Sequence, residues 1–406
     1  MSKIVEVHIV QLVGPSNLNR DESGSPKIAE LGGTRIRYGS PGIKRNIRMG
    51  DEFRERMAEG IAERTKYIPS HVAELLVNGG RDPEEALLVA SFVSGLVFHS
   101  KVEGVKLDRL IYITPIEVAA IAKIAKDCWE ASLSEAKKWS TEKGKTSGEK
   151  DSKSNGKKRK DKDEYRAKDE VLQAEIEALQ KSVLPTTPDE AAFGRMLTSL
   201  DAWNIDGASY FAHAIGTHNT YIQDDYWTAV DDRSPAENPG AGMLGTAGFV
   251  AGCIYRYFAF DVEQMRTNLL RGRQEGPELD DLVRRTVEAL VWAGIGWPTK
   301  DTAKQHSLAT FERPACVLLV MRDHGTPLSL FSAFDPGVVQ DRGEGLVAAS
   351  VRALDRQWGR VTLAYEEERS NLIAAFCTTD NLVNLKDPQV ESNGKLASIL
   401  RAWLEG

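Results

Sequence analysis

The sequence lacks the features of a membrane or secreted protein. Its longest apolar run covers residues 86–98 and is shorter than the ~18 residues that a bilayer-spanning helix requires. No signal-peptide pattern precedes the first strand-like residues. The four cysteines are far apart and form no CxxC pair. These absences predict a cytoplasmic protein without a membrane partner, whose cysteines are buried free thiols.

Recognisable catalytic and nucleotide-binding motifs are also missing. The sequence contains no GxxxxGK[ST] loop, no GxGxxG directly following its first strand and no GxSxG. Only two of the seven histidines, His213 and His218, lie close in sequence, and a spacing of five would place them on different faces of a helix. We therefore expect a protein that is not an enzyme, with no catalytic residues, no metal and no cofactor.

What the sequence does contain is an uneven distribution of charge. The net charge is −7, yet residues 137–162 hold eleven Lys and Arg against four Asp and Glu, a net +7. The rest of the chain therefore carries −14. Such a distribution favours the binding of anions through local basic patches, while the remaining surface stays acidic.

Hydrophobic periodicity predicts an α+β fold that a helical insertion interrupts early. We expect strands at 4–13, 35–37, 248–260, 315–334 (with a turn at 323–327) and 359–367. Helices are expected at 261–271, 278–293 and 344–357, and within the insertion at 51–67, 82–98, 114–139 and 169–184. Residues 140–163 show no apolar periodicity, which predicts a disordered, lysine-rich loop.

The starts of the predicted helices follow one rule, with a single exception. Asp82, Thr114 and Thr187 each precede a proline, and a carboxylate follows in the first turn. Such an acid satisfies free amides and complements the helix dipole, worth roughly 0.3–1 kcal/mol. Ser40 and Pro41 begin the same way, but Lys44 and Arg45 follow in place of the acid. An external anion such as phosphate would explain this inversion.

Basic residues around this helix start form an extended cationic track, which suits consecutive phosphates of a polynucleotide. Arg35 and Arg37 alternate on a predicted strand, and further cations follow on the helix at Lys44, Arg45 and Arg48. The alternative interpretation is an ordinary solvated basic helix face.

A second candidate is the segment "DDYWTAVDD" at 224–232, which precedes a stretch rich in Pro and Gly. This pattern predicts a projecting hairpin arm with Tyr226 and Trp227 exposed. Aromatic side chains on such an arm could stack on bases, at roughly 1–3 kcal/mol per stack. The alternative is that both rings only pack the base of the arm.

The segment "HIVQLVGPSNLNRDESGSPKIAELGGTRIR" and the later stretches at 193–218, 224–257 and 302–334 resemble the CasC family. CasC proteins are the RNA-wrapping backbone subunits of the type I-E CRISPR Cascade complex and belong to the RAMP superfamily. The resemblance implies an RRM-like (ferredoxin-like) palm, helical fingers and a long β-hairpin thumb. In this chain the palm would be 1–50, 189–223 and 248–406, the fingers 51–188, and the thumb 224–247.

The resemblance also implies partners and contact residues. The partners would be CRISPR RNA (crRNA), the target DNA strand, further copies in a head-to-tail filament, and the large, small, CasD-type cap and crRNA-processing endonuclease subunits. The crRNA-binding residues would be Asn19, Arg20, Lys27, Arg35, Arg37, Ser40, Lys44, Arg45, Arg48, Met196, Tyr226, Trp227 and Thr228. Target DNA would be contacted by Lys137, Lys138, Lys143 and Lys145. Where the family usually has a glutamine this chain has Pro41, which removes a side-chain contact.

Two other functions remain open at this point. Backbone subunits of related type III complexes cut target RNA with an aspartate in the loop after the first strand, where Asp21 and Glu22 lie here. The second open function is that of a free-standing nucleoprotein that coats RNA generally. The detailed similarity favours the non-catalytic, DNA-targeting family.

Overall fold

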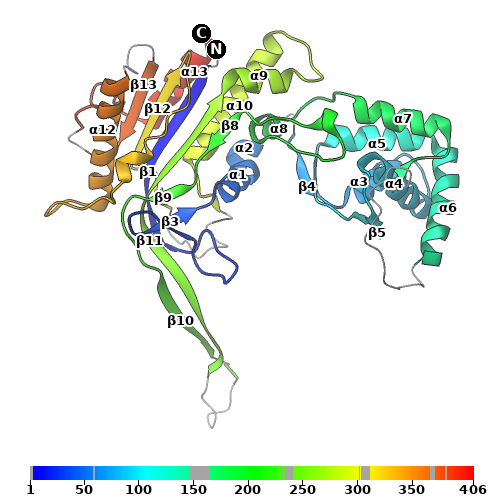
Figure 1. Cartoon of the computed structure of the whole chain (residues 1–406), viewed down its shortest axis with the longest axis horizontal. Helices are drawn as coiled ribbons and strands as arrows, with labels where there is room; N and C mark the ends of the chain where they lie inside the picture. Colours follow the sequence, from blue (N-terminus) through cyan, green and yellow to red (C-terminus); the bar gives the residue numbers. More distant parts are fainter. Residues whose placement is uncertain are drawn as a thin grey trace, which may run out of the picture. The chain divides into compact units, whose positions relative to one another are not determined.

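The computed structural model describes residues 3–57, 60–146, 165–230, 232–233, 241–300, 302, 311–365, 371–379 and 382–406. The fold is α+β, and the chain divides into two compact units (Figure 1). The first unit comprises Met1–Ala58, Ala208–Arg266 and Asp280–Gly406, and the second comprises Glu59–Gly207 and Thr267–Leu279. The second unit therefore starts and ends later than the predicted insertion at 51–188, and it includes a segment from beyond residue 260.

The first unit contains most of the strands. Its strands are β1 (Ile4–Ser16), β2 (Ile28–Glu30), β3 (Thr34–Tyr38), β8 (Ser209–Phe211), β9 (Ala214–Gly216), β10 (Gln223–Val230), β11 (Ala241–Asp261), β12 (Cys316–Arg322) and β13 (Asn371–Cys377). Its helices are α1 (Ser40–Met49), α2 (Asp51–Arg54), the 3-10 helix η3 (Phe331–Phe334), α12 (Leu346–Tyr365) and α13 (Asn393–Glu405). Two helices, α9 (Val262–Leu270) and α10 (Pro277–Ile295), have residues in both units.

The second unit is mainly helical. Its helices are α3 (Ile68–Asn78), α4 (Pro83–Phe98), α5 (Pro115–Asp127), α6 (Trp129–Thr146), α7 (Glu170–Lys181), α8 (Pro188–Phe193) and the 3-10 helix η2 (Asp201–Trp203). Its short strands are β4 (Glu63–Thr65), β5 (Val102–Glu103), β6 (Lys106–Leu107) and β7 (Ile111–Ile113). Within the described part of the chain, no helix is long and apolar enough to cross a membrane.

The large sheet has the strand order β13-β12-β1-β11-β9-β3-β2, and β8 and β10 also pair with β11. β1 is a central strand that pairs antiparallel with both β11 and β12. Glu6 and His8 alternate along β1 with Val5, Val7 and Ile9, and all five side chains are buried. Both faces of β1 are therefore covered.

Glu6 and His8 are accommodated in this interior by polar partners. The carboxylate of Glu6 is paired with the buried Arg322 guanidinium on β12 and accepts a hydrogen bond of 3.0 Å from the Leu328 amide. His8 Nδ1 lies 2.8 Å from the Tyr255 hydroxyl. Burial raises the pKa of Glu6, but His8 and Arg322 outweigh it and hold that pKa below the usual value. The charge is thus buried as a pair, which is how interiors tolerate it.

The strand predicted at 359–367 is wrong, because α12 continues from Leu346 to Tyr365. Its buried side chains recur at helical spacing, at Leu354, Trp358 and Val361. Gly359 lies within this helix and is a point of close packing. A Cβ atom there would overlap the Asn384 side chain, so the glycine makes room for this neighbour.

Other predicted elements also need correction. The helix expected at 51–67 is reduced to α2 and is followed by β4. The helix expected at 114–139 is two helices that meet at Cys128, and residues 140–146 of the predicted loop extend α6. Only the first half of the strand pair predicted at 315–334 is a strand, since the second half contains η3.

The cysteines differ from the prediction as well. Cys316 and Cys377 lie directly opposite each other on β12 and β13 and form a disulfide, whereas Cys128 and Cys253 are free. A sequence separation of 61 residues gave no sign of this register.

The second unit confirms the predicted helix starts. Asp82 accepts hydrogen bonds from the amides of Glu84 and Glu85, and Thr114 and Thr187 begin capping boxes with Glu117 and Glu190. The two glutamates of these boxes are buried, and the guanidinium of Arg195 lies between them, 2.8 Å from Glu117 and 2.6 Å from Glu190. One arginine therefore forms ion pairs with the starts of both α5 and α8.

Candidate nucleic-acid interface

As predicted, the first turn of α1 contains no acidic residue, but the amides at its start already have hydrogen-bond partners. Gly39, rather than Ser40, is the N-cap residue, and no side chain caps the helix. The Gly39 amide donates to Asn19 Oδ1 at 2.9 Å, and the Ser40 amide lies 3.4 Å from His213 Nδ1. Pro41 has no amide hydrogen. The prediction of free amides that await a phosphate is therefore wrong, and the positive groups at this site are side chains.

His213 and Asn19 were not recognised in the sequence as partners of α1. Asn19 belongs to the loop after β1, and this loop is fixed to β3, since the Lys27 carbonyl accepts a hydrogen bond from the Arg37 amide at 3.1 Å. The structure thus brings the predicted loop residues and the start of α1 together. The partners are distant in sequence from α1, so local sequence patterns could not predict this arrangement.

The side chains of the predicted cationic track differ in how far they are buried. Arg20 and Arg45 are exposed, and Lys27, Arg37 and Lys44 are half-buried. The Arg35 guanidinium is fully buried and donates to the carbonyls of Gly216, at 3.1 Å, and Phe334, at 3.3 Å. Arg48 is also buried. Alternation along β3 therefore did not place Arg35 on the exposed surface, and burial lowers the pKa of its side chain.

Lys44 lies against an aromatic ring. Its Nζ atom is 5.4 Å from the centre of the Phe211 ring on β8, a cation–π contact. Arg45, the next residue along α1, is exposed. The remaining track thus consists of Arg20, Lys27, Arg37, Lys44 and Arg45.

Asp21, the candidate catalytic residue of the alternative function, shapes its own loop. Its Oδ1 atom accepts hydrogen bonds from the Ser23 hydroxyl at 2.7 Å, the Ser23 amide at 2.9 Å and the Ser25 amide at 3.0 Å. The Ser23 hydroxyl bond is the main cause that lowers the pKa of Asp21. An aspartate that closes a turn in this way is common in loops. Among the described residues, no group of three or more His, Cys, Asp or Glu could hold a metal ion.

The predicted arm is a two-stranded hairpin formed by β10 and the first part of β11, which projects from the sheet (Figure 1). Every residue of β10 is exposed. Tyr226 is 61 % exposed and Trp227 is 43 % exposed, and as neighbours in a strand they lie on opposite faces. The interpretation in which both rings are packed at the base of the arm is therefore wrong.

The Trp227 indole lies flat across the partner strand. Trp227 is paired with Gly245, and a Cβ atom on that glycine would lie 2.9 Å from the indole ring. Leu244, which is paired with Thr228, and Met243 are each 64 % exposed. The hairpin thus presents aromatic and aliphatic side chains on both faces. An isolated two-stranded ribbon is only marginally stable, so these faces are suited to a partner.

The hairpin base contacts the loop that holds the basic residues. Asn17 donates from Nδ2 to the Gly248 carbonyl at 3.1 Å and to the Gly24 carbonyl at 2.9 Å. Basic side chains and exposed aromatic side chains thus belong to connected segments of the first unit. A positive groove beside aromatic platforms is the general arrangement for binding single-stranded nucleic acid.

The remaining predicted contact residues belong to the second unit. Met196 is 82 % exposed and follows Arg195. Lys137 is ion-paired with Glu85 at 2.8 Å, and Lys138 is exposed. Lys143 and Lys145 fall in α6, but their side chains lie outside the described residues, as does most of the lysine-rich segment.

The chain matches one family model and solved structures of one fold. A family model described as "CT1975-like protein" matches residues 5–402. A solved structure titled "CRISPR RNA-guided surveillance complex, pre-nicking" superimposes with a TM-score of 0.76 at 23 % identity, covering 98 % of this chain and 99 % of the other. A second, titled "CRISPR RNA-guided surveillance complex", gives 0.69 at 22 % identity, with coverage of 98 % and 99 %. A search of the curated proteins gave no match.

Proposed function

Because the chain belongs to the CT1975-like protein family, we propose that it is a non-catalytic, crRNA-binding backbone subunit of a type I-E CRISPR surveillance complex. The two solved structures of the same fold are titled as CRISPR RNA-guided surveillance complexes, which supports this proposal. In this proposal the large sheet is an RRM-like palm, the second unit forms the fingers, and the hairpin of β10 and β11 is the thumb. The observation that carries it is the hairpin, exposed on both faces and joined at its base to the basic loop.

The basic side chains would hold the guide without reading it. Phosphate contacts fix the position of a strand but carry no sequence information, so guides of any sequence can be bound. Arg20, Lys27, Arg37, Lys44 and Arg45 are the accessible candidates. Sequence recognition would then pass to base pairing between guide and target DNA, as in other RNA-guided systems.

The hairpin would deform the guide. Tyr226 and Trp227 face opposite ways, so the hairpin could contact bases on both of its sides when it is inserted between them. Wedges of this kind unstack bases and kink a strand at an energetic cost that added contacts offset. Copies would associate head to tail, because only a contact between two different surfaces gives an open filament.

The experiment is a salt titration of guide retention by the double variant Lys44→Ala/Arg45→Ala. Each lost phosphate contact should reduce the slope of log affinity against log salt by roughly 0.7. We expect a slope lower by about one to one and a half units. Lys123→Ala/Lys126→Ala, on exposed residues of α5, is the control with the same change of charge. A slope unchanged from the unsubstituted protein would contradict the proposed interface.

The ribonuclease alternative is tested separately. The purified complex is incubated with complementary RNA and Mg²⁺, and we expect no cleavage, because Asp21 Oδ1 is occupied by its own turn. Cleavage at regular intervals that Asp21→Ala abolishes would show that the backbone is catalytic. Binding of random cellular RNA in place of guides of defined length would instead identify a general RNA-coating protein.

A further inference from the structure

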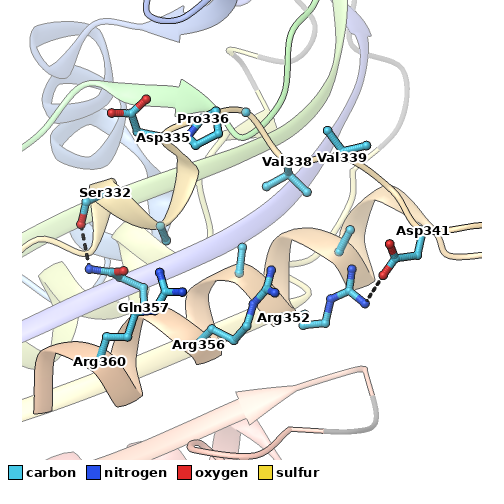
Figure 2. Close-up of a pocket in the computed structure, with 14 residues that line it drawn as sticks. Ser332, Asp335, Pro336, Val338, Val339, Asp341, Arg352, Arg356, Gln357 and Arg360 are labelled. Carbon is cyan, nitrogen blue, oxygen red and sulfur yellow. Dashed lines mark hydrogen bonds and ion pairs between the residues drawn. The ribbon is translucent and has the colours of Figure 1, made fainter. Parts of the chain in front are cut away.

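A polar pocket of about 360 Å³ lies on the first unit, between α12 and the segment 332–341 (Figure 2). Three arginines of α12, Arg352, Arg356 and Arg360, line it at a spacing of four residues. At 1.5 Å per residue this spacing places them about 6 Å apart along one face of the helix. None of them belongs to the loop, to α1 or to the hairpin described above.

The three arginines are not equivalent. Arg352 is paired at 2.6 Å with both Asp341 and Glu344. Arg356 and Arg360 are exposed, and in the part of the chain that the structure describes they form no ion pair or hydrogen bond. Like charges four residues apart on a helix repel, so this pair lowers helix stability unless an anion lies between them.

The charges around the pocket favour a carboxylate over a polynucleotide. Three acids (Asp335, Asp341 and Glu344) lie at or beside its wall, but Asp341 and Glu344 are paired with Arg352, and Asp335 acts on the nearby Arg35. Within the described residues, only Arg356 and Arg360 of the pocket remain without an acid, which is less than the extended basic stripe of a nucleic-acid surface. Two such arginines in a concave setting suit one or two protein carboxylates, which guanidinium groups bind in a bidentate manner.

The hairpin carries such carboxylates. Asp224 and Asp225 are exposed, lie on opposite faces of β10, and form no ion pair within the described residues. β10 pairs only with β11 there, so its other edge is open, and open edges tend to associate with a second chain. Two acids beside Tyr226 are also unfavourable next to RNA phosphates, which indicates a different partner for this end of the strand.

We propose that the Arg356–Arg360 pocket is the docking site for Asp224 and Asp225 of a neighbouring copy. The inference rests on the proposed filament and specifies one contact that would link its subunits. β10 would lie with its open edge toward α12, so that one carboxylate projects on each side and reaches one arginine. Because the two surfaces differ, the contact repeats without closing, as a filament requires.

The test is a charge exchange in the full chain assembled on CRISPR RNA. One variant carries Arg356→Glu/Arg360→Glu, and the other carries Asp224→Lys/Asp225→Lys. We expect each alone to weaken association between copies at least about tenfold, since opposed like charges cost several kcal/mol. The measurement is the number of copies per guide by native mass spectrometry across a protein titration.

A mixture of the two variants should restore assembly. In an alternating filament each Asp pair meets an Arg pair, and each Lys pair meets a Glu pair, so every interface is complementary. A control with Lys123→Glu/Lys126→Glu has the same charge change on α5 and should assemble normally. Circular dichroism and thermal unfolding verify that both variants are folded.

The outcomes separate the inference from the proposed function. If the arginine variant assembles as the unsubstituted protein does, the pocket is not a docking site. Failure of the mixture, together with loss of nucleic acid from the arginine variant alone, would assign the pocket to nucleic acid and overturn the inference. If the unsubstituted protein binds no guide RNA, the proposed function itself fails, and that result is read before any variant is compared.

Discussion

The starts of α1 and of α5 show two ways to satisfy a helix N-terminus. At α5 the chain supplies everything locally, with Thr114 as cap and Glu117 as the returning carboxylate. At α1 neither is present, and the amides of Gly39 and Ser40 depend on Asn19 and His213, which are distant in sequence. The second arrangement leaves Lys44 and Arg45 without a local acid. The two helix starts thus differ in where the partners of their amides come from, and only α1 combines satisfied amides with basic side chains that face no acid in the first turn.

The largest expected effect concerns the arginine that joins α5 to α8. Arg195→Met should lower the free energy of unfolding by about 3–5 kcal/mol, because it removes the cation and hydrogen-bond donor that the buried Glu117 and Glu190 share. Chemical denaturation monitored by circular dichroism measures it. A loss below about 1 kcal/mol would show that the capping boxes hold these helices without Arg195.

Glu190 makes the same region sensitive to pH. Burial, with Glu117 and Asp189 nearby, raises the pKa of Glu190 to about 8, despite Arg195. The folded state then holds a proton that the unfolded state releases above about 4.5, so this contribution to stability is complete below that pH and is lost as the pH rises through 8. We expect the unfolding temperature to fall between pH 6 and 8.5. Glu190→Gln should flatten that dependence, and an equal fall in both proteins would contradict the assignment.

A smaller effect compares the caps directly. Thr114→Ala should cost about 0.5–2 kcal/mol, since it removes the acceptor of the Glu117 amide. Ser40→Ala, at the start of α1, should lower the free energy of unfolding by only about a few tenths of a kcal/mol, because the Ser40 side chain makes no capping hydrogen bond. Equal losses in thermal unfolding would abolish the contrast between the two helix starts.

The smallest expected effect on stability comes from giving α1 an acid in its first turn, as α5 has. Gly42 occupies the third helical position, and a Cβ atom there would meet only Asn19 Nδ2, at 3.7 Å. Gly42→Glu should therefore stabilise the fold by roughly 0.3–1 kcal/mol through the helix dipole. The same charge should weaken retention of the guide. Gly42→Ala separates the loss of glycine from the added charge, and unchanged RNA binding by Gly42→Glu would remove α1 from the interface.

Local patterns predicted the parts of the structure that depend on neighbouring residues. Asp82, Thr114 and Thr187 were recognised as caps because a cap, a proline and an acid lie within a few positions. Exposure of Tyr226 and Trp227 was predicted because few apolar residues surround them in sequence. Such features need no knowledge of the rest of the chain.

Features that depend on distant residues were not predicted. Arg35 is buried because the carbonyls of Gly216 and Phe334 converge on it, and no short-range pattern reports that. The packing role of Gly359 was not predicted either, because Asn384, its neighbour in space, is 25 residues away. The arginines of α12 were missed for the same reason, since their pocket forms only when the segment 332–341 folds against the helix.

The length of β11 has a mechanical consequence. This single strand runs from Ala241 to Asp261, about 70 Å at 3.3 Å per residue, and pairs first with β10 and then with β1. A load at the hairpin is therefore carried without a hinge loop into the ladder with β1. When a load runs along the strands it shears many hydrogen bonds at once, so a projection that pushes against a bound strand is braced by the centre of the sheet.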